Sequence, residues 1–227
     1  MRLSIRMTNS RHKEIQRELD DLGAGLNILK IKYNKAILKK FRIYLEVLFK
    51  MRNRLHLLSH QDYERIAKRH FLVSLMALDF VKGYYNICDI GAGAGFPSLP
   101  LKIIKPTMKL TLIESNKKKA DFLQYLTEEL GYPDVDVVNE RAQDYQEKTF
   151  EVILLKAVGK IKKLITPVSD LVKPGGRAIF YKTHRVEEEI KQTKKDLGKK
   201  SFYLRVEKLF TPLEHLPLAL VILDKNQ

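Results

Sequence analysis

The feature that most restricts the fold of this chain is a change of pattern after Gly83. Before this residue, apolar residues recur at helical spacing; after it, short apolar runs alternate with amphipathic helical segments. This alternation is typical of a mostly parallel sheet whose strands are joined by crossover helices. We therefore predict an α/β domain over residues 85–227. Residues 1–84 are expected to form a helical cap or subdomain, because two helices cannot bury both their apolar faces alone.

Two main helices are expected in the first segment. From about Ile28 to Leu55, apolar residues step by three or four, which predicts an amphipathic helix with a basic outer face. A second helix is expected from Asp62, as its N-cap, to about Phe80. The first residues, Met1–Arg11, lack the apolar core of a signal peptide and are expected to be a flexible start. A transit peptide is the minor alternative.

Seven strands are expected in the second segment. The last two apolar runs, Tyr203–Phe210 and Ala219–Leu223, leave no room for a helix between them and predict an antiparallel hairpin. A turn is expected at 173–176, where a proline and two glycines supply fixed and positive φ angles. The other expected strands are Tyr84–Ile90, Lys109–Glu114, Val135–Asn139, Glu151–Leu155 and Arg177–Lys182, and the expected helices are Ser98–Lys105, Asn116–Leu130, Lys160–Val172 and Glu187–Leu197.

The turn after the first expected strand contains three alternating glycines. Gly91, Gly93 and Gly95 let the backbone approach a ligand closely, and the following helix offers unpaired N–H groups with a partial positive charge. The dinucleotide fingerprint has the different spacing Gly-x-Gly-x-x-Gly, so a nicotinamide-dependent oxidoreductase is the less favoured alternative. Because tight turns also need glycine for structural reasons, the motif alone is weak evidence.

Two carboxylates accompany this turn. Glu114 ends the second strand, where it can accept hydrogen bonds from ribose hydroxyls, and Asp89 precedes the turn, where it can hold an ammonium group. An acid, glycines and an acid describe a nucleoside that carries an amino acid, which is S-adenosyl-L-methionine. With the terminal hairpin, they predict a class I S-adenosylmethionine-dependent methyltransferase, Rossmann-like, with a seven-stranded mostly parallel sheet. No metal is expected.

The charge is unevenly distributed and predicts a polyanionic partner. Residues 1–84 carry 18 basic and 8 acidic residues, residues 85–155 carry 8 and 11, and residues 156–227 carry 16 and 8. A positive field attracts nucleic acid and makes binding dependent on salt. A basic surface that only keeps the protein soluble is the alternative. The candidate phosphate contacts are Arg52, Arg54, Lys117, Lys118 and Lys119.

Cysteine content and apolar runs predict the compartment. The single cysteine, Cys88, excludes an internal disulfide and suits a reducing compartment, so a cytoplasmic protein is expected. The longest uncharged apolar run, Phe71–Leu78, is far shorter than the roughly 18 residues that cross a bilayer. No membrane partner is expected.

Several segments together resemble a known family. Asp89–Leu101 reads DIGAGAGFPSLPL, and Leu112–Lys119 reads LIESNKKK; Arg69–Leu72, Arg141–Gln143 and Lys156-Ala157 extend the likeness. These segments are similar to the small-subunit rRNA methyltransferase G family, also called glucose-inhibited division protein B. The resemblance covers roughly residues 37–182. It implies methylation of guanine N7 in 16S rRNA, or in an assembly intermediate of the small subunit, with S-adenosylmethionine as the cofactor.

The resemblance also implies individual site residues. Cofactor contacts are expected at Gly91, Phe96, Ala142 and Gln143, with Lys156 in the place of a family arginine. The chain departs from the family pattern here and at three further places. Gln143 replaces a glutamate, Val73 an aspartate, and residues 56–58 an Asn-Leu-Thr stretch. These departures motivate the alternative of a non-catalytic protein of methyltransferase fold that binds rRNA during ribosome assembly.

The expected chemistry needs few catalytic groups. Guanine N7 is a neutral lone pair on the major-groove edge, so methyl transfer to it requires no general base, and positioning can suffice. No catalytic base or nucleophile is identified in the sequence. The end of the fourth strand lacks the Asn/Asp-Pro-Pro-aromatic element of amine methyltransferases, and Cys88 lies inside a strand. Lys156 and Lys182, both at strand ends, suggest ribose 2′-hydroxyl transfer, but the aspartate of such sites is missing. A monomer is expected, because docking on rRNA needs a free face.

Overall fold

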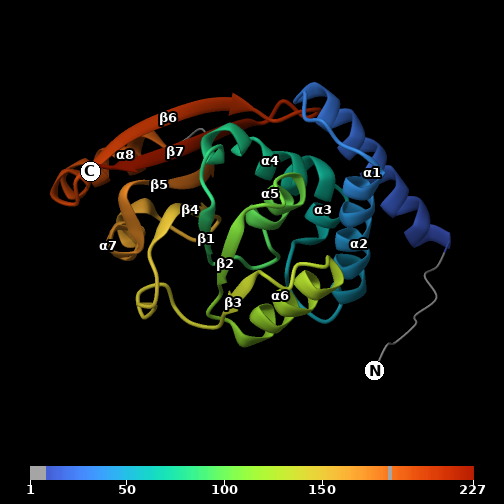
Figure 1. Cartoon of the computed structure of the whole chain (residues 1–227). Helices are drawn as coiled ribbons and strands as arrows, with labels where there is room; N and C mark the ends of the chain where they lie inside the picture. The colour runs from blue at the N-terminus through green and yellow to red at the C-terminus, as the bar shows by residue number, and fades with distance from the viewer. Residues whose placement is uncertain (1–8, 184–185) are drawn as a thin grey trace.

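The computed structural model describes residues 9–183 and 186–227, and a seven-stranded sheet forms its centre (Figure 1). The strand order is β3-β2-β1-β4-β5-β7-β6. The first five strands pair in parallel, whereas β7 pairs antiparallel with both β5 and β6, so the predicted terminal hairpin is confirmed. The strands are β1 (Asn86–Ile90), β2 (Lys109–Ile113), β3 (Asp136–Val138), β4 (Phe150–Lys156), β5 (Val172–Thr183), β6 (Phe202–Phe210) and β7 (Pro217–Lys225).

The strand order reverses beside β1, and this places the site. From β1 the chain moves outward to β2 and β3, and it then returns to the other side of β1 as β4. Asp89 of β1 therefore pairs with Leu112 on one side and with Leu154 on the other. In open α/β sheets, ligands bind at the carboxyl ends of the strands where the order reverses.

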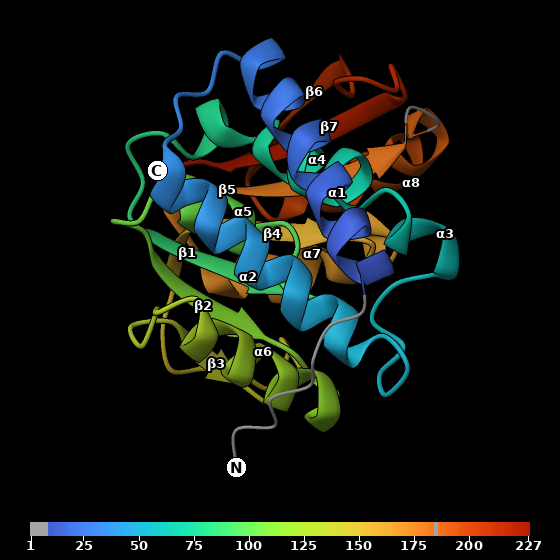
Figure 2. The ribbon, with the colours of Figure 1, turned by 90° about the vertical axis from the view of Figure 1, so that its right-hand side faces the viewer.

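Helices cover both faces of the sheet. Figure 2 shows α1 (Asn9–Ile28) and α2 (Lys35–Met51) crossing one face. Near their expected positions lie α5 (Ser98–Ile104), α6 (Lys117–Glu129), α7 (Ile161–Leu171) and α8 (Glu187–Lys199). None of the helices in residues 9–183 and 186–227 is long and apolar enough to cross a membrane.

The amino-terminal helices differ from the predicted ones. The expected helix from Ile28 to Leu55 begins only at Lys35, because the side chain of Asn34 accepts a hydrogen bond from the Ile37 N–H and caps it. The expected flexible start, Met1–Arg11, is wrong for residues 9–11, which form the first turn of α1; residues 1–8 lie outside the described part of the chain.

The second expected helix is broken into short pieces. Ser59, and not Asp62, is the N-cap, because its hydroxyl accepts a hydrogen bond from the Asp62 N–H. The buried carboxylate of Glu18 in α1 accepts a hydrogen bond from the Ala67 N–H at 2.7 Å, where a π-helical turn begins. This contact between distant segments replaces a regular helix. The pieces are α3 (His60–Tyr63), η1 (Ala67–Phe71), α4 (Leu72–Leu75) and η2 (Leu78–Val81).

The expected turn at 173–176 lies inside a strand. The chain runs through this segment as part of β5, and the register with β4 shifts there between Phe150 and Val152. Gly175 has the expected positive φ of 73°, so the glycine is required by a strand irregularity and not by a closing turn.

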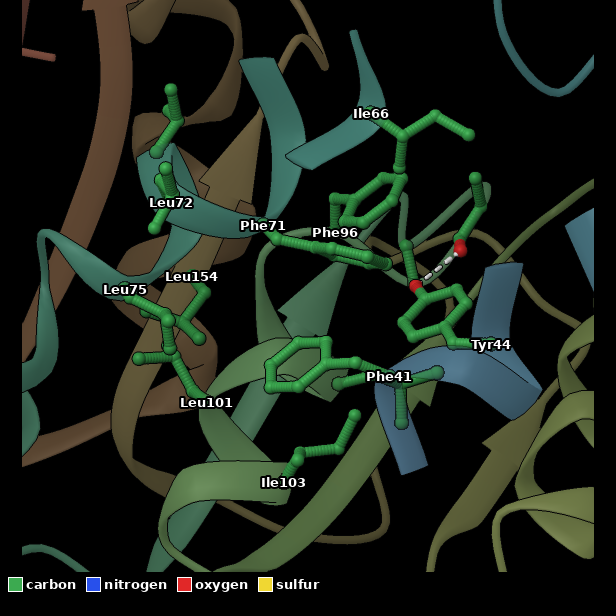
Figure 3. Packing of buried hydrophobic residues seen from close by; sticks show 14 of the residues in the cluster. Phe41, Tyr44, Ile66, Phe71, Leu72, Leu75, Phe96, Leu101, Ile103 and Leu154 are labelled. Carbon is green, nitrogen blue, oxygen red and sulfur yellow. Dashed lines mark hydrogen bonds between the residues drawn. The ribbon is translucent and has the colours of Figure 1, made fainter. Parts of the chain in front are cut away.

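One apolar core joins the amino-terminal helices to the sheet. Figure 3 shows Phe41 and Tyr44 of α2 against Phe71 and Phe96, with ring centroids of Phe41 and Phe71 4.8 Å apart. The Tyr44 hydroxyl donates a hydrogen bond to the Ala94 carbonyl at 2.6 Å (Figure 3). Residues from both sides of Gly83 thus share one core, and the division at residues 84 and 85 stays a prediction.

Candidate functional site

The glycine-rich turn at the end of β1 has a backbone conformation that favours glycine. Gly91, Gly93 and Gly95 have φ angles of 69°, 56° and 92°, which residues with a side chain rarely adopt. A Cβ at Gly95 would lie 2.5 Å from the Tyr44 hydroxyl oxygen, and one at Gly91 would lie 3.0 Å from Val158. The glycines therefore serve the packing of the turn as well as its conformation.

Glu114 connects this turn to β2. One carboxylate oxygen accepts a hydrogen bond from the Gly93 N–H at 2.9 Å, and the other accepts one from the Asn116 N–H at 2.8 Å. The residue is 7% exposed. Its expected contact with ribose hydroxyls stays a prediction. The geometry shows that this carboxylate also fixes the distance between the turns that follow β1 and β2.

Asp89 is completely buried beneath the turn. Its Oδ2 accepts hydrogen bonds from the Ser98 hydroxyl at 2.5 Å and the Ser98 N–H at 3.3 Å, while Oδ1 is buried without a partner among the described residues. Burial raises the pKa of this carboxyl to about 8. A cation near Oδ1 would stabilise the charged form, which is the role expected of a ligand's ammonium group.

A cavity of about 550 Å³ opens beside the turn. Its lining comes from the segment 56–59, from the turn between Gly91 and Phe96, and from Lys156 and Ala157 at the end of β4. Asp62, His70 and Lys119 complete it. Glycines at 91 and 93 thus border a space in which a ligand can contact backbone directly.

Phe96 and His70 form a stacked pair at one wall of the cavity. The ring of Phe96 is stacked with Tyr44, with centroids 5.4 Å apart and an interplanar angle of 11°. It is also stacked with His70, with centroids 4.7 Å apart and an angle of 24°. Lys156 Nζ lies 3.1 Å from His70 Nδ1, and Asp62 Oδ1 lies 3.5 Å from His70 Nε2. Asp62, His70 and Lys156 therefore form a row of three ionisable groups, the first two from the segment 60–75 and the third from β4.

The charge states in this row follow from burial. Burial lowers the pKa of His70 to about 4, although Asp62 opposes this shift. Burial also lowers the pKa of Lys156 to about 8. Hydrogen bonds from His70 and Ser59 lower the pKa of Asp62. At neutral pH, a protonated Lys156 donates to Nδ1 of a neutral imidazole whose Nε2–H faces a carboxylate.

Five expected cofactor contacts are not among the lining residues of this cavity: Asp89, Gly95 and Glu114 beside the glycine-rich turn, and Ala142 and Gln143 farther along the chain. Ala142 and Gln143 occupy the turn after β3, which is closed by a hydrogen bond from the Asp144 N–H to the Arg141 carbonyl at 2.9 Å. Gln143 is exposed, and Ala142 packs against the core on the face of α7 and α8. Neither residue lines the 550 Å³ cavity. Their contact with a cofactor stays a prediction.

The five expected RNA contacts do not form one group. The guanidinium of Arg52 lies 4.8 Å from the Tyr63 ring centroid, and Arg54 is exposed. Lys117 pairs with Asp121 one helical turn later, and Lys118 is exposed. Lys119 lines the cavity, so its side chain faces the expected cofactor space.

Two residues of the site are not identified by sequence patterns. The helical period presents Tyr44 only as one apolar position, although its hydroxyl holds the glycine-rich turn. Asp62 has the pattern of a helix cap and instead faces His70. The one signal for Tyr44 is its hydroxyl, because the neighbouring positions of the same helical period are aliphatic or phenylalanine. No local signal marks the second.

The residues present fit S-adenosylmethionine. Oδ1 of Asp89, buried without a partner among the described residues, suits an ammonium group, and Gly93, where a Cβ would lie 3.7 Å from the Gly91 carbonyl, leaves room for close approach of a ligand to the backbone. Gly91, Gly93 and Phe96, which line the cavity, would hold the ligand there.

Comparisons with known proteins agree with this geometry. A family model described as rRNA small subunit methyltransferase G matches residues 37–216. A relative named ribosomal RNA small subunit methyltransferase G, from Mycoplasma capricolum, is 35% identical over 175 residues, which are 74% of each chain. Another of that name, from Listeria monocytogenes, is 32% identical over 208 residues, 87% of this chain and 86% of that one.

Solved structures confirm the predicted fold class. An O-methyltransferase from Bacillus cereus, in complex with SAH, has a TM-score of 0.60 at 14% identity and covers 93% of this chain and 100% of that one. An rRNA methylase from Streptococcus thermophilus has a TM-score of 0.52 at 15% identity, covering 67% and 95%. Fold, glycine-rich turn and relatives agree with the resemblance seen in the sequence: the chain belongs to the rRNA small subunit methyltransferase G family.

Proposed function

We propose that the protein transfers the methyl group of S-adenosylmethionine to N7 of a guanine in 16S rRNA, either free or within a small-subunit assembly intermediate. The observation that carries the proposal is a cofactor-sized cavity, bordered by the glycine-rich turn, in a chain of this family. The enzyme class and cofactor follow from the family and fold. The choice of guanine N7 is supported by the chemistry of the site.

The site suits a nucleophile that needs no base. His70 is neutral, its Nδ1 is engaged by Lys156 and its Nε2 faces Asp62, so it is poorly placed to remove a proton. Cys88 is completely buried, and burial raises the pKa of its thiol, so it supplies no thiolate. An amine or hydroxyl acceptor must lose a proton, whereas guanine N7 does not.

The transfer balances without an acid or a base. When bound, S-adenosylmethionine supplies a methyl group on a positively charged sulfur, and its C–S bond breaks with the electron pair going to sulfur. The N7 lone pair forms the new N–C bond, and the positive charge moves to the imidazole ring of the base. The turn after β1, which Glu114 fixes through the Gly93 N–H, would hold the donor, and this would supply the entropic advantage of a positioned reaction.

Charge and family support an RNA partner. The chain carries a net charge of +15, and the relatives are named for small-subunit rRNA. We propose that the protein acts in the cytoplasm. We also propose that it is a monomer, because a large substrate needs an open face of the protein. Arg52, Arg54, Lys117 and Lys118 are proposed phosphate contacts on the surface.

Mass mapping of rRNA nucleosides tests the proposal directly. In cells that lack the protein, one N7-methylguanosine of the small subunit is expected to disappear, and a plasmid copy should restore it. Gly91→Ala should fail to restore it, because its Cβ meets Val158 at 3.0 Å and its φ is positive. Gly198→Ala is the matched control, since no atom lies within 4 Å of the new Cβ. If every modification survives deletion, the proposed activity is wrong, and a protein that binds rRNA without methylating it is the remaining interpretation.

A further inference from the structure

A second cleft adjoins the cofactor cavity at the carboxyl ends of β4 and β5. Its volume is about 610 Å³. Tyr181 and Thr183 of β5, Leu218 of β7 and Val73 of α4 form much of its lining. The cleft shares Asp62, His70, Lys156 and Ala157 with the cofactor cavity. The wall that carries Lys156 therefore stands between the expected cofactor and a second space.

The lining of this cleft suits the flat face of a base. Val73, Tyr181 and Leu218 supply an apolar surface, on which a ring can lie. Lys68, Arg69 and Lys182 lie around this surface. Lys68 pairs with Asp21, and Lys182 pairs with Glu189. Arg69 pairs with Asp62 and Glu214. These carboxylates offset part of the positive charge, but four basic side chains and one carboxylate line the cleft itself, so its own lining keeps an excess of positive charge that suits a phosphate.

Lys156 is the polar group best placed to recognise what enters. In the described part of the chain, His70 Nδ1 is the hydrogen-bond partner of its Nζ, at 3.1 Å. A protonated lysine has three N–H donors and no acceptor. Two donors therefore remain for a ligand at the boundary between the two spaces. Because the ammonium group is buried, each donor left without a partner carries a desolvation cost.

Donors at this position distinguish the two purines. On the major-groove edge, guanine presents O6 and N7 as acceptors, whereas adenine presents an N6 amino donor beside N7. A lysine at this edge can bind O6 of guanine and is repelled by the amino group of adenine. A hydrogen bond to O6 leaves the N7 lone pair free toward the cofactor cavity.

On the basis of the proposed function, we propose that the second cleft receives the target guanine and that Lys156 donates a hydrogen bond to its O6. Lys156 then selects guanine over adenine. This role replaces the expected contact of Lys156 with the cofactor. The lysine that stands in the place of a family arginine then binds the substrate.

The test compares two bases in two protein variants. The substrate is a small-subunit particle reconstituted on rRNA with either guanine or 2-aminopurine at the mapped position; 2-aminopurine keeps N7 and lacks O6. Lys156→Met should lower kcat/KM for guanine by about 10- to 100-fold, the discrimination of a good polar contact to a base, and leave kcat/KM for 2-aminopurine within about twofold. Lys50→Met is the matched control, because this lysine also donates one side-chain hydrogen bond, to Tyr125 at 2.9 Å, and lies outside both cavities.

Cofactor binding provides a readout that does not depend on turnover. Calorimetry should give the same affinity for S-adenosylhomocysteine in the wild type and in Lys156→Met. Lys156→Arg should restore the preference for guanine, because arginine also donates. The proposal is overturned if Lys156→Met lowers kcat/KM equally for both bases, or if it weakens cofactor binding by the same factor as the reaction. A wild type that methylates neither base contradicts the proposed function instead, so the two failures are distinguishable.

Discussion

Two lysines lie at opposite ends of the sheet strands, Lys102 buried at the amino edge, where the parallel strands begin, and Lys156 partly buried at the carboxyl edge, where they end. They differ in how their charge is satisfied. At the amino edge, Lys102 is 1% exposed, and its Nζ donates to the carbonyls of Pro106 and Met108 and to the carboxylate of Asp134. At the carboxyl edge, Lys156 has a neutral imidazole as its hydrogen-bond partner. A buried cation with three acceptors stabilises the structure, whereas one with spare donors is suited to bind a ligand.

Removal of each lysine should therefore affect stability in opposite ways. Lys102→Met leaves buried carbonyls without donors and should lower the free energy of unfolding by about 3 kcal/mol. Lys156→Met removes a buried ammonium group with little compensation and should leave stability unchanged or higher. Urea unfolding of both variants measures the difference. Equal destabilisation by the two substitutions would remove the contrast between the two edges.

Asp89 extends the comparison to a buried carboxyl group at the carboxyl edge. Burial raises its pKa from 3.8 to about 8, so the folded state binds more protons than the unfolded state between these values. Stability is then lost as the pH rises from about 4 to 8. Relative to Asp89→Asn, the wild type should lose stability throughout this range, by at most about 1.4 kcal/mol per pH unit.

Thermal unfolding between pH 5 and 8 measures the Asp89 effect. The exposed Asp20→Asn is the control, and it should follow the wild type. S-adenosylhomocysteine, whose ammonium group is expected near Asp89, should reduce the loss. Parallel pH profiles of wild type and Asp89→Asn would show that Asp89 is already ionised in the folded protein.

The pH dependence of the reaction provides a further test of the role of Lys156. Burial lowers it to about 8, against the opposing effects of Asp62 and Asp89. If the ammonium form binds O6, kcat/KM for guanine should fall above pH 8 by up to about tenfold per pH unit. Lys156→Arg should stay active up to pH 9, because arginine keeps its proton. A flat wild-type profile from pH 7 to 9 would contradict a role for the charged form.

The smallest expected effect concerns the tyrosine behind the glycine-rich turn. Tyr44→Phe removes the hydrogen bond to the Ala94 carbonyl and should lower the free energy of unfolding by about 1 kcal/mol. It should also weaken binding of S-adenosylhomocysteine, because the turn loses a support. Tyr132→Phe, at the amino edge near Lys102, should leave that binding unchanged. Calorimetry of both variants provides the measurement.

The sequence is sufficient for the parts of the fold that local pattern determines. Strands β1, β2 and β4 are mostly apolar runs, and the turn from Gly91 to Gly95 needs positive φ angles that glycine adopts readily. The helix α1 is absent from the prediction, although Ile15, Leu19 and Leu22 show its buried helical period. The apolar period of this helix is present in the sequence, but it follows directly after the basic start of the chain, which favours a flexible segment.

Other parts of the site depend on contacts that no local pattern records. The break in the second expected helix depends on Glu18, 49 residues before the Ala67 N–H that it binds. The row from Asp62 to Lys156 depends on where β4 returns beside β1. Asp62 has the residue type and spacing of a helix cap, and the position of His70 gives it a partner that this local pattern does not indicate.

The hydrogen bond from Tyr44 to Ala94 has a consequence for the synthesis of the chain. Synthesis proceeds from the amino terminus, so α2 leaves the ribosome about 50 residues before the segment that covers its aromatic side. Until that segment emerges, Phe41 and Tyr44 have no native neighbours from the sheet. The first third of the nascent protein is therefore the stage at which chaperones should matter most, and a helper that shields apolar surface should bind there and leave once β1 and α5 are made.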